Sequence, residues 1–421
     1  LAGVLLCLVV IFLASKLGGE ICTRLSFPPV LGELVGGVVV GISGLHLLLF
    51  PESSLAIDTS AIATLLQWGA QSDPNTIQTI SEHYMEALSV LAELGVIFLL
   101  FEIGLESDLK ELIRVGPQAA VVAVVGVTLP FLAGTAGLIA WFGVPTIPAI
   151  FAGAALTATS IGITAKVLAE IQRLNTREGQ IIVGAAVLDD ILGIIVLAVV
   201  ASLAKDGQVQ IANIVYLVVS ATVFLVGSIV LGRLLSPYFV WLVNRLKTRG
   251  SLLIAALIVA FIWSYIAVAI HLEAILGAFT AGLILAETEK QADLEAQVVP
   301  IADMLVPVFF VCVGARTDIS VLNPLIPANR EGLILALFLV AVAVVGKLLT
   351  GATVFGPGPL NRWAIGVGMI PRGEVGLVFA GVGTASGVLS PALSAAIIVM
   401  VIFTTFFAPP LLRWVFQDSS S

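Results

Sequence analysis

Apolar runs of about 20 residues recur along the whole sequence, and they constrain the fold more than any other feature. A helix of that length crosses a hydrocarbon core of roughly 30 Å. Because lipid offers no hydrogen bonds to the backbone, a spanning segment must be a helix or a strand of a closed barrel. The runs here are continuous rather than alternating, which excludes the barrel. The sequence therefore predicts an all-α polytopic membrane protein.

Composition agrees with this prediction. Of the 421 residues, 59% are hydrophobic and only 11% are charged. A soluble domain of this size needs about 25% charged residues to cover its surface, so the expected surroundings are membrane lipid. The net charge of -8 gives no indication of a nucleic-acid partner. The chain begins on Leu1 inside an apolar run and without Met, so we expect it to be trimmed at this end.

The apolar runs divide the chain into about 13 predicted transmembrane helices. Pro237, Trp241 and Arg245 lie in segment 236–249, which we expect to form an interfacial helix. The expected spans are 1–15, 29–50, 86–105, 117–141, 146–169, 178–204, 211–232, 251–270, 273–287, 298–314, 332–355, 360–386 and 391–412.

The distribution of Lys and Arg predicts the orientation. With the N-terminus outside, the outer loops carry only Lys205, Arg316 and Arg330. The spans hold Lys166, Lys347 and Arg372, and all the other basic residues among the 19 fall in the inner loops. This excess of positive charge predicts a cytoplasmic C-terminus, in a bacterial-type inner membrane or an equivalent internal membrane.

An odd number of spans allows two six-helix halves with the seventh span as connector. Such a connector reverses the second half, which gives the inverted repeats of secondary transporters. Spans five and twelve are each the fifth of their half. One is interrupted by a hydroxyl-rich stretch and the other by Pro371 and Gly373, and a matched pair of broken helices indicates an ion site.

Polar residues gather at the middle of four spans. A charge inside a span costs about 3 kcal/mol or more, so each one requires an explanation. Each group lies within about four residues of the middle of its span, or about 6 Å along a helix, so we expect the groups to meet at one depth. They are Asp189 and Asp190 in span six, Thr157, Thr159 and Ser160 in span five, Lys347 in span eleven, and Arg372 and Glu374 in span twelve.

The two neighbouring aspartates should face different partners. Consecutive residues on a helix point about 100° apart, so one carboxylate can face an ion pathway while the other meets a counter-charge such as Lys347. Burial makes a bare carboxylate costly, so it would hold either a proton or a cation, which is a minimal exchange mechanism. The alternative is a buried Asp–Lys pair that only stabilises helix packing. The glycines at 32, 36, 37 and 41 predict either a helix–helix contact or a dimer face.

Five ordered motifs carry a resemblance to a known family. They are PPVLGELVGGVVVG (28–41), LAELGVIFLLFEIGLE (91–106), TATSIGITAKVL (157–168), GAAVLDDILGII (184–195) and PRGEVGLVFAGVG (371–383). Together they resemble the monovalent cation:proton antiporter-2 family, and most closely its NapA-type sodium/proton antiporters. The resemblance covers essentially the whole chain. It implies two crossing broken helices, a homodimer, elevator-like alternating access and a role in pH homeostasis.

The resemblance also implies roles for residues and regions. Asp190 matches the family's carboxylate that carries the ion or proton, and Asp189 matches the partner of that carboxylate. Lys347 matches the lysine that pairs with this partner. The only metal expected is the transported Na⁺, at Asp190 and Asp189. Thr157 and Ala158 fall at the first break, and Glu374 lies in the second crossing helix. The implied regions are scaffold or dimerisation helices in 1–105 and 251–314, core transport helices in 115–204 and 332–412, and a connecting helix at 211–232.

We therefore expect no enzyme and no cofactor, but an antiporter that exchanges Na⁺ or Li⁺ for H⁺ and carries net charge. A potassium/proton antiporter of the potassium-efflux branch remains open, although that branch usually has Asp-Gln where this chain has Asp189-Asp190. An intramembrane aspartyl protease needs its two aspartates on separate helices and a GxGD motif, which is missing here. A symporter or organic-anion carrier would need anion-clamping arginines.

Overall fold

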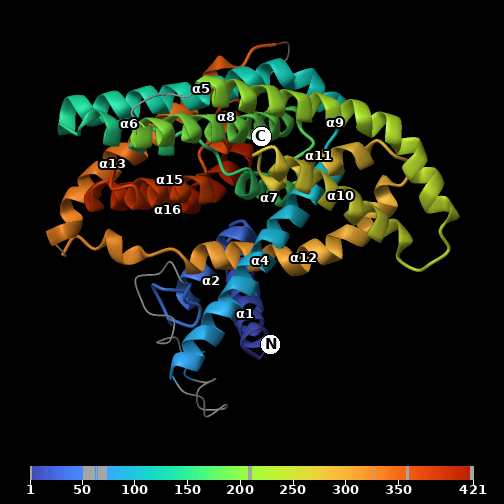
Figure 1. The fold of residues 1–421 in the computed structure, drawn as a ribbon, viewed down its shortest axis with the longest axis horizontal. Coiled ribbons are helices and arrows are strands. Elements are labelled where there is room, and N and C mark those ends of the chain that lie inside the picture. The colour runs from blue at the N-terminus through green and yellow to red at the C-terminus, as the bar shows by residue number, and fades with distance from the viewer. Residues whose placement is uncertain are drawn as a thin grey trace. The chain divides into compact units, whose positions relative to one another are not determined.

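The computed structural model describes residues 2–50, 62, 64, 74–206, 211–325, 327–356 and 360–417. Within these ranges every regular element is a helix (Figure 1). The first half comprises α1 (Ala2–Arg24), α2 (Pro29–Val40), α4 (Pro74–Glu106), α5 (Leu109–Phe142), α6 (Thr146–Ala155), α7 (Ile161–Glu170) and α8 (Arg177–Asp206). After α9 (Ile211–Arg245), the second half comprises α10 (Ser251–Ala269), α11 (Ala274–Ala286), α12 (Gln291–Ala315), α13 (Pro327–Leu348), α14 (Arg362–Gly368), α15 (Glu374–Ala385) and α16 (Pro391–Gln417).

This element order confirms the predicted fold class. If α6 with α7 and α14 with α15 each count as one broken helix, the described elements match the predicted spans one to one. Nine of the described helices are long and apolar enough to cross a membrane, and α2, α6, α11 and part of α15 are shorter apolar helices. Two 3₁₀ turns, Ile319–Leu322 and Leu349–Thr353, complete the elements.

Both predicted breaks are present. Helix α6 ends at Ala155 and α7 begins at Ile161, so residues 156–160 leave the helical path. The Thr157 hydroxyl competes with helical hydrogen bonding by donating to the carbonyl oxygen of Ala154. Between α14 and α15, residues 369–373 are non-helical, since Pro371 lacks a backbone N–H and Gly373 adopts an extended conformation.

Two sequence predictions about helix ends are wrong. Segment 236–249 is not a separate interfacial helix, because α9 continues through Pro237 to Arg245. Its last turn is stabilised by the Arg245 guanidinium, 4.0 Å above the Trp241 ring. The second span was expected to reach residue 50, but α2 ends at Val40. Residues 51–73, apart from 62 and 64, lie outside the described residues.

The first of two compact units contains residues 1–99 and 298–320. Its helices approach closely at glycines: a Cβ on Gly32 would lie 2.1 Å from the carbonyl oxygen of Gly18, and one on Gly37 would lie 2.3 Å from that of Val311. These two glycines therefore serve contacts of α2 with α1 and α12 within the chain. In the same unit the Ser15 hydroxyl donates to Glu33 Oε1 at 3.1 Å.

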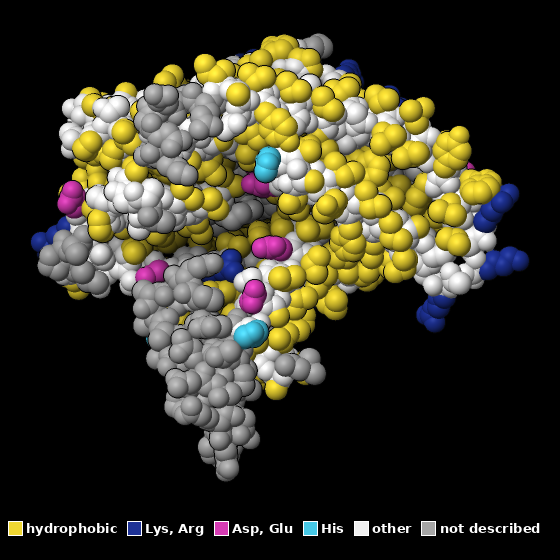
Figure 2. Space-filling view, viewed as in Figure 1, with side chains coloured by type: hydrophobic (Ala, Val, Ile, Leu, Met, Phe, Trp, Pro, Cys, Tyr) yellow, Lys and Arg dark blue, Asp and Glu magenta, His cyan; other side chains and the backbone are white. Residues whose placement is uncertain are grey.

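The second unit contains residues 100–297 and 321–421 and holds both broken helices. In it α5 packs along α8, α13 along α16, and α10 along α11. Large hydrophobic side chains remain exposed, among them Trp141 at 75% and Tyr265 at 74%, as expected of surfaces that contact lipid. Figure 2 shows mostly hydrophobic side chains on the face in view, with few charged ones.

Candidate functional site

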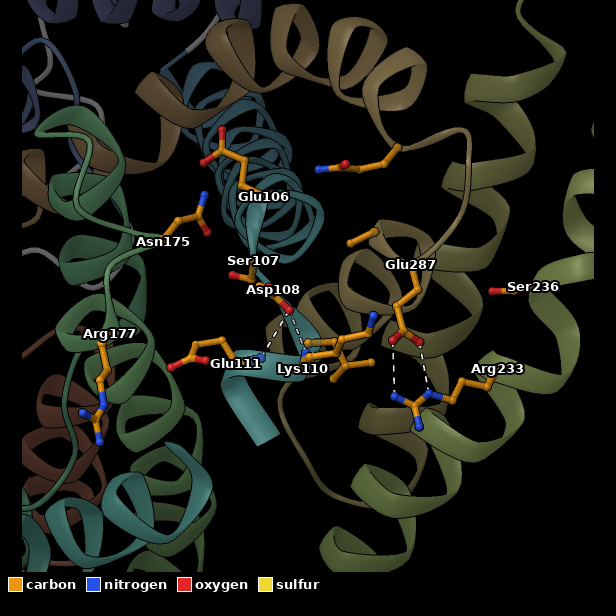
Figure 3. A pocket seen from close by; sticks show the side chains of 13 residues that line it. Glu106, Ser107, Asp108, Lys110, Glu111, Asn175, Arg177, Arg233, Ser236 and Glu287 are labelled. Carbon is orange, nitrogen blue, oxygen red and sulfur yellow. Dashed lines mark hydrogen bonds and ion pairs between the residues drawn. The ribbon is translucent and has the colours of Figure 1, made fainter. Parts of the chain in front are cut away.

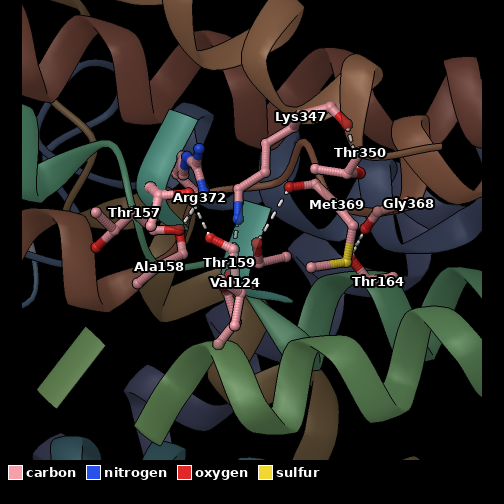
Figure 4. A network of polar contacts seen from close by, with 12 residues as sticks. Val124, Thr157, Ala158, Thr159, Thr164, Lys347, Thr350, Gly368, Met369 and Arg372 are labelled. Carbon is pink, nitrogen blue, oxygen red and sulfur yellow. Dashed lines mark hydrogen bonds and ion pairs between the residues drawn. The ribbon is translucent and has the colours of Figure 1, made fainter. Parts of the chain in front are cut away.

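The two breaks cross and hold each other through hydrogen bonds. The Ser160 backbone N–H donates to the carbonyl oxygen of Pro371 at 2.8 Å. The Thr159 hydroxyl donates to the carbonyl oxygen of Met369 at 3.1 Å, and the Thr164 hydroxyl to that of Gly368 at 2.9 Å (Figure 4). Backbone groups that the breaks release from helices are thus partly satisfied across the crossing, as a non-helical segment in a membrane requires.

Arg372 places its positive charge at the C-terminal end of α6. Its Nη1 atom donates to the carbonyl oxygens of Thr157 at 3.0 Å and Ala158 at 2.6 Å (Figure 4). The side chain is fully buried, and Nε and Nη2 have no hydrogen-bond partner among the described residues. Because carbonyl dipoles make a helix C-terminus negative, the guanidinium offsets this charge. The Thr405 hydroxyl donates to the Arg372 carbonyl oxygen and fixes the break from α16.

Asp189 and Lys347 form a buried ion pair. Lys347 Nζ donates to Asp189 Oδ2 at 2.8 Å, and both side chains have an exposed fraction of 0%. Lys347 reaches past Gly126 of α5, where an added Cβ would lie 3.0 Å from Nζ. This is the contact that the sequence analysis expected for one of the two aspartates. Its role in transport stays a prediction.

Asp190 faces a different space from Asp189. It lines a small cavity together with Ala158, Thr159, Ser160, Gly373 and Glu273. About 10 Å³ of this cavity is open to the centre of a water-sized sphere, roughly the room for one water molecule. Ser160 is the N-cap of α7 and Gly373 that of α15. Because helix N-termini carry partial positive charge, both helices stabilise an anionic Asp190.

The predicted site residues do not all reach this cavity. Ala158, Thr159 and Ser160 line it, but Thr157 does not. The Thr157 hydroxyl instead donates to the carbonyl oxygen of Ala154 at 2.7 Å, at the end of α6. Arg372 and Lys347 lie beside the cavity residues in the hydrogen-bond network. Glu374 begins α15, but its side chain lies outside the described residues.

One cavity residue, Glu273, escaped the sequence analysis. It is the N-cap of α11 and coincides with the first residue of the predicted ninth span. The available signal was a carboxylate directly before the apolar sequence AILGAF.

A second, larger cavity of about 1050 Å³ lies within the second unit and is lined by charges of both signs (Figure 3). It opens where α4 and α11 end and where α5 begins. Arg233 binds Glu287 through two hydrogen bonds of 3.1 and 3.2 Å, linking α9 to the end of α11. Asp108 caps α5 by accepting from the backbone N–H groups of Lys110 and Glu111. This cavity offers hydrated ions a polar surface.

Comparison with known proteins identifies the family. The family model described as "Sodium/hydrogen exchanger, transmembrane" matches residues 6–418. The high-affinity Na⁺/H⁺ antiporter NhaS3 of Synechocystis sp. is 70% identical over 419 residues, covering 100% of this chain and 91% of that protein. The Na⁺/H⁺-K⁺ antiporter GerN of Bacillus cereus is 34% identical, covering 96% of this chain and 94% of that protein.

A solved structure shares the fold. The sodium proton antiporter MjNhaP1 from Methanocaldococcus jannaschii matches with a TM-score of 0.61 and 18% identity, covering 99% of this chain and 96% of that one. The relatives are transporters rather than enzymes, which removes the protease alternative. On the extent of the family match and the identity to these relatives, the chain belongs to the sodium/hydrogen exchanger family.

Proposed function

We propose that this protein exchanges Na⁺ or Li⁺ for H⁺ across a membrane and that Asp190 carries either ion in turn. The observation that carries this proposal is the placement of Asp190, a 7%-exposed carboxylate in a cavity beside two helix breaks. The 70% identity to a named Na⁺/H⁺ antiporter supports the same function.

The cavity chemistry suits a dehydrated alkali cation. A hard cation binds oxygen ligands, and here a carboxylate, the hydroxyls of Thr159 and Ser160 and the backbone of Ala158 line one space. The Thr159 hydroxyl gives its hydrogen to Met369, so its lone pairs remain available for a cation. Room for about one water leaves no space for a hydration shell, so the ion would exchange water for protein oxygens.

Competition between Na⁺ and H⁺ for Asp190 then leads to exchange of the two ions. A bare Asp190 in a low-dielectric site is costly, and either Na⁺ or H⁺ removes that cost. Both cannot bind the same carboxylate together, so the site crosses the membrane loaded with one or the other. This coupling needs a single carboxylate and no cofactor.

We further propose elevator-like alternating access by the core regions 115–204 and 332–412, against scaffold helices in 1–105 and 251–314. The hydrogen bonds between the two breaks support a core that moves as one body, because they tie α6 and α7 to α14 and α15. A homodimer would anchor the scaffold helices. We place the N-terminus outside, so the charged cavity of Figure 3 faces the cytoplasm.

Transport is proposed to be electrogenic, with two protons exchanged for one sodium ion. The ion pair of Asp189 and Lys347 provides a second protonation event beyond Asp190. When sodium arrives, Asp189 would turn to the cation. Lys347, buried and without its partner, would release a proton because burial disfavours a lone charge.

The test is exchange in proteoliposomes, followed with a ΔpH-sensitive dye during pulses of Na⁺, Li⁺ and K⁺. We expect a response to Na⁺ and Li⁺ in the wild type and none in Asp190→Asn, which keeps the volume but loses the charge. Asp293→Asn is the matched control, since Asp293 is 65% exposed. A wild type that responds to K⁺ alone would favour potassium exchange, which the name of GerN includes. A wild type that responds to none of the three cations overturns the proposed function.

A further inference from the structure

The cavity beside Asp190 has a second carboxylate. Glu273 lines it from the start of α11, whereas Asp190 comes from the middle of α8. The Glu273 side chain makes no capping hydrogen bond to its own helix, although an N-cap carboxylate often does. Its place in the cavity wall is therefore not explained by capping.

A buried hydroxyl in the same cavity independently points to a ligand. Ser160 is 7% exposed, and its Oγ atom has no hydrogen-bond partner among the described residues. A buried polar atom left unpaired is costly, so its presence indicates a ligand that supplies the missing contact. Oγ lies against Gly373, where an added Cβ would be 2.6 Å away. The hydroxyl, Asp190 and Glu273 thus surround a space for one small ion.

Two carboxylates at one small space favour a cation there. Lys347 pairs with Asp189, and Arg372 donates to the carbonyl oxygens of Thr157 and Ala158. Asp190 and Glu273 both line the cavity, and a cation bound between them would offset the repulsion of two like charges in a low-dielectric site.

Helix α11 holds Glu273 firmly in place. A Cβ on Gly277 would lie 2.4 Å from the carbonyl oxygen of Trp263, so α10 and α11 are in backbone contact. A Cβ on Gly282 would lie 2.8 Å from the Cα of Gly104, at the end of α4. The carboxylate therefore projects from a helix fixed on two sides, which suits a ligand of defined position.

We propose that Glu273, which stands on a scaffold helix, is a second carboxylate ligand of the cation in the access state of this structure, and that it raises the affinity of the site for small alkali ions in that state. This inference rests on the proposed function, in which Asp190 carries the cation. The alternative is that Glu273 only shares a structural contact with its neighbours. A structural role would affect stability but leave sodium affinity unchanged.

The experiment measures the apparent Na⁺ KM in proteoliposomes and the Na⁺ midpoint of thermal stabilisation in detergent. For Glu273→Gln we expect both values to rise about tenfold, which corresponds to about 1.4 kcal/mol, while the maximal rate stays within about twofold. Glu273→Asp keeps the charge on a shorter side chain and should fall between Gln and the wild type. Glu331→Gln is the control, because Glu331 is an exposed acid near the start of α13.

The possible outcomes distinguish a failure of this inference from a failure of the proposed antiport function. If Glu273→Gln matches the wild type in both measurements, Glu273 does not bind the cation, whether or not Asp190→Asn is inactive. If Glu273→Gln does not fold, a wild-type KM in Glu273→Asp overturns the inference. If the wild type shows no exchange, the proposed function fails, and the detergent midpoint still decides the role of Glu273.

Discussion

Lys347 Nζ lies 2.8 Å from Asp189 Oδ2, and neither side chain is reached by solvent. Such a pair is a weak source of stability, because desolvation of both charges offsets their attraction. The second oxygen of the carboxylate, Oδ1, has no hydrogen-bond partner among the described residues. The pair is therefore incompletely satisfied, which fits a proton-exchanging role better than a purely structural one.

Removing one partner of this pair should be more harmful than removing both. Lys347→Gln removes the ion-pair partner of Asp189, and we expect a loss of about 3–5 kcal/mol of stability. Adding Asp189→Asn removes the orphaned charge and should restore much of that loss. Thermal unfolding in detergent of the two single variants and the double variant measures the coupling. Additive effects would contradict an energetically coupled pair.

Much of the fold could be predicted because the membrane restricts the choices. Backbone groups in lipid must form hydrogen bonds within the protein, so each long apolar run in the sequence predicts a helix. The Thr-rich stretch and the Pro-containing stretch indicated the two breaks. Helix ends were less predictable. The end of α2 at Val40 depends on packing, because Gly41 lies against Ala315, where an added Cβ would be 2.3 Å from its Cα. The hydrophobic pattern along the sequence gives no indication of this contact between Gly41 and Ala315.

The site could be predicted where a charged side chain inside a span requires a counter-charge. This requirement made Lys347 the expected counter-charge for one of the two aspartates, and Lys347 pairs with Asp189. The direction of Thr157 could not be predicted, because a break rotates side chains away from helical positions. Glu273 was missed because the residues that line the cavity with it come from α7, α8 and α15, which are distant in sequence.

Ser160, rather than Thr157, is the hydroxyl residue placed to affect cation affinity. The sequence made Thr157 a candidate site residue, but its hydroxyl donates to the carbonyl oxygen of Ala154. We now expect Ser160→Ala to raise the apparent Na⁺ KM about two- to twelvefold, if the contact of its oxygen with the ion is worth as much as a hydrogen bond, about 0.5–1.5 kcal/mol. Thr157→Ala should cost stability and leave KM near the wild-type value. Initial rates against Na⁺ concentration distinguish the two, and the reverse ranking would mean that Thr157 faces the ion.

Competition at Asp190 sets a pH dependence. If Na⁺ and H⁺ exclude each other at Asp190, lowering the pH by one unit should raise the apparent Na⁺ KM by up to about tenfold in the acidic range, by mass action. Release of a second proton from Lys347 would add up to about a further tenfold for each pH unit. At higher pH, where protons no longer compete, KM should become constant. The check is a series of KM measurements with equal pH on both sides of the vesicle membrane. A KM independent of pH throughout would mean that the two ions use separate sites.

The charge moved per cycle tests Lys347 as the source of a second proton. We expect a wild-type current after a sodium jump on a supported membrane, because two protons exchange for one sodium ion. At about 100 mV that charge is worth roughly 2.3 kcal/mol, or an additional ion gradient of about 45-fold. Lys347→Gln removes the second proton and should give dye-detected exchange with little or no current. A wild type that exchanges the ions but carries no current would show one-for-one exchange. A folded Lys347→Gln variant with full current would instead mean that Lys347 is a structural counter-ion and that the second proton binds elsewhere.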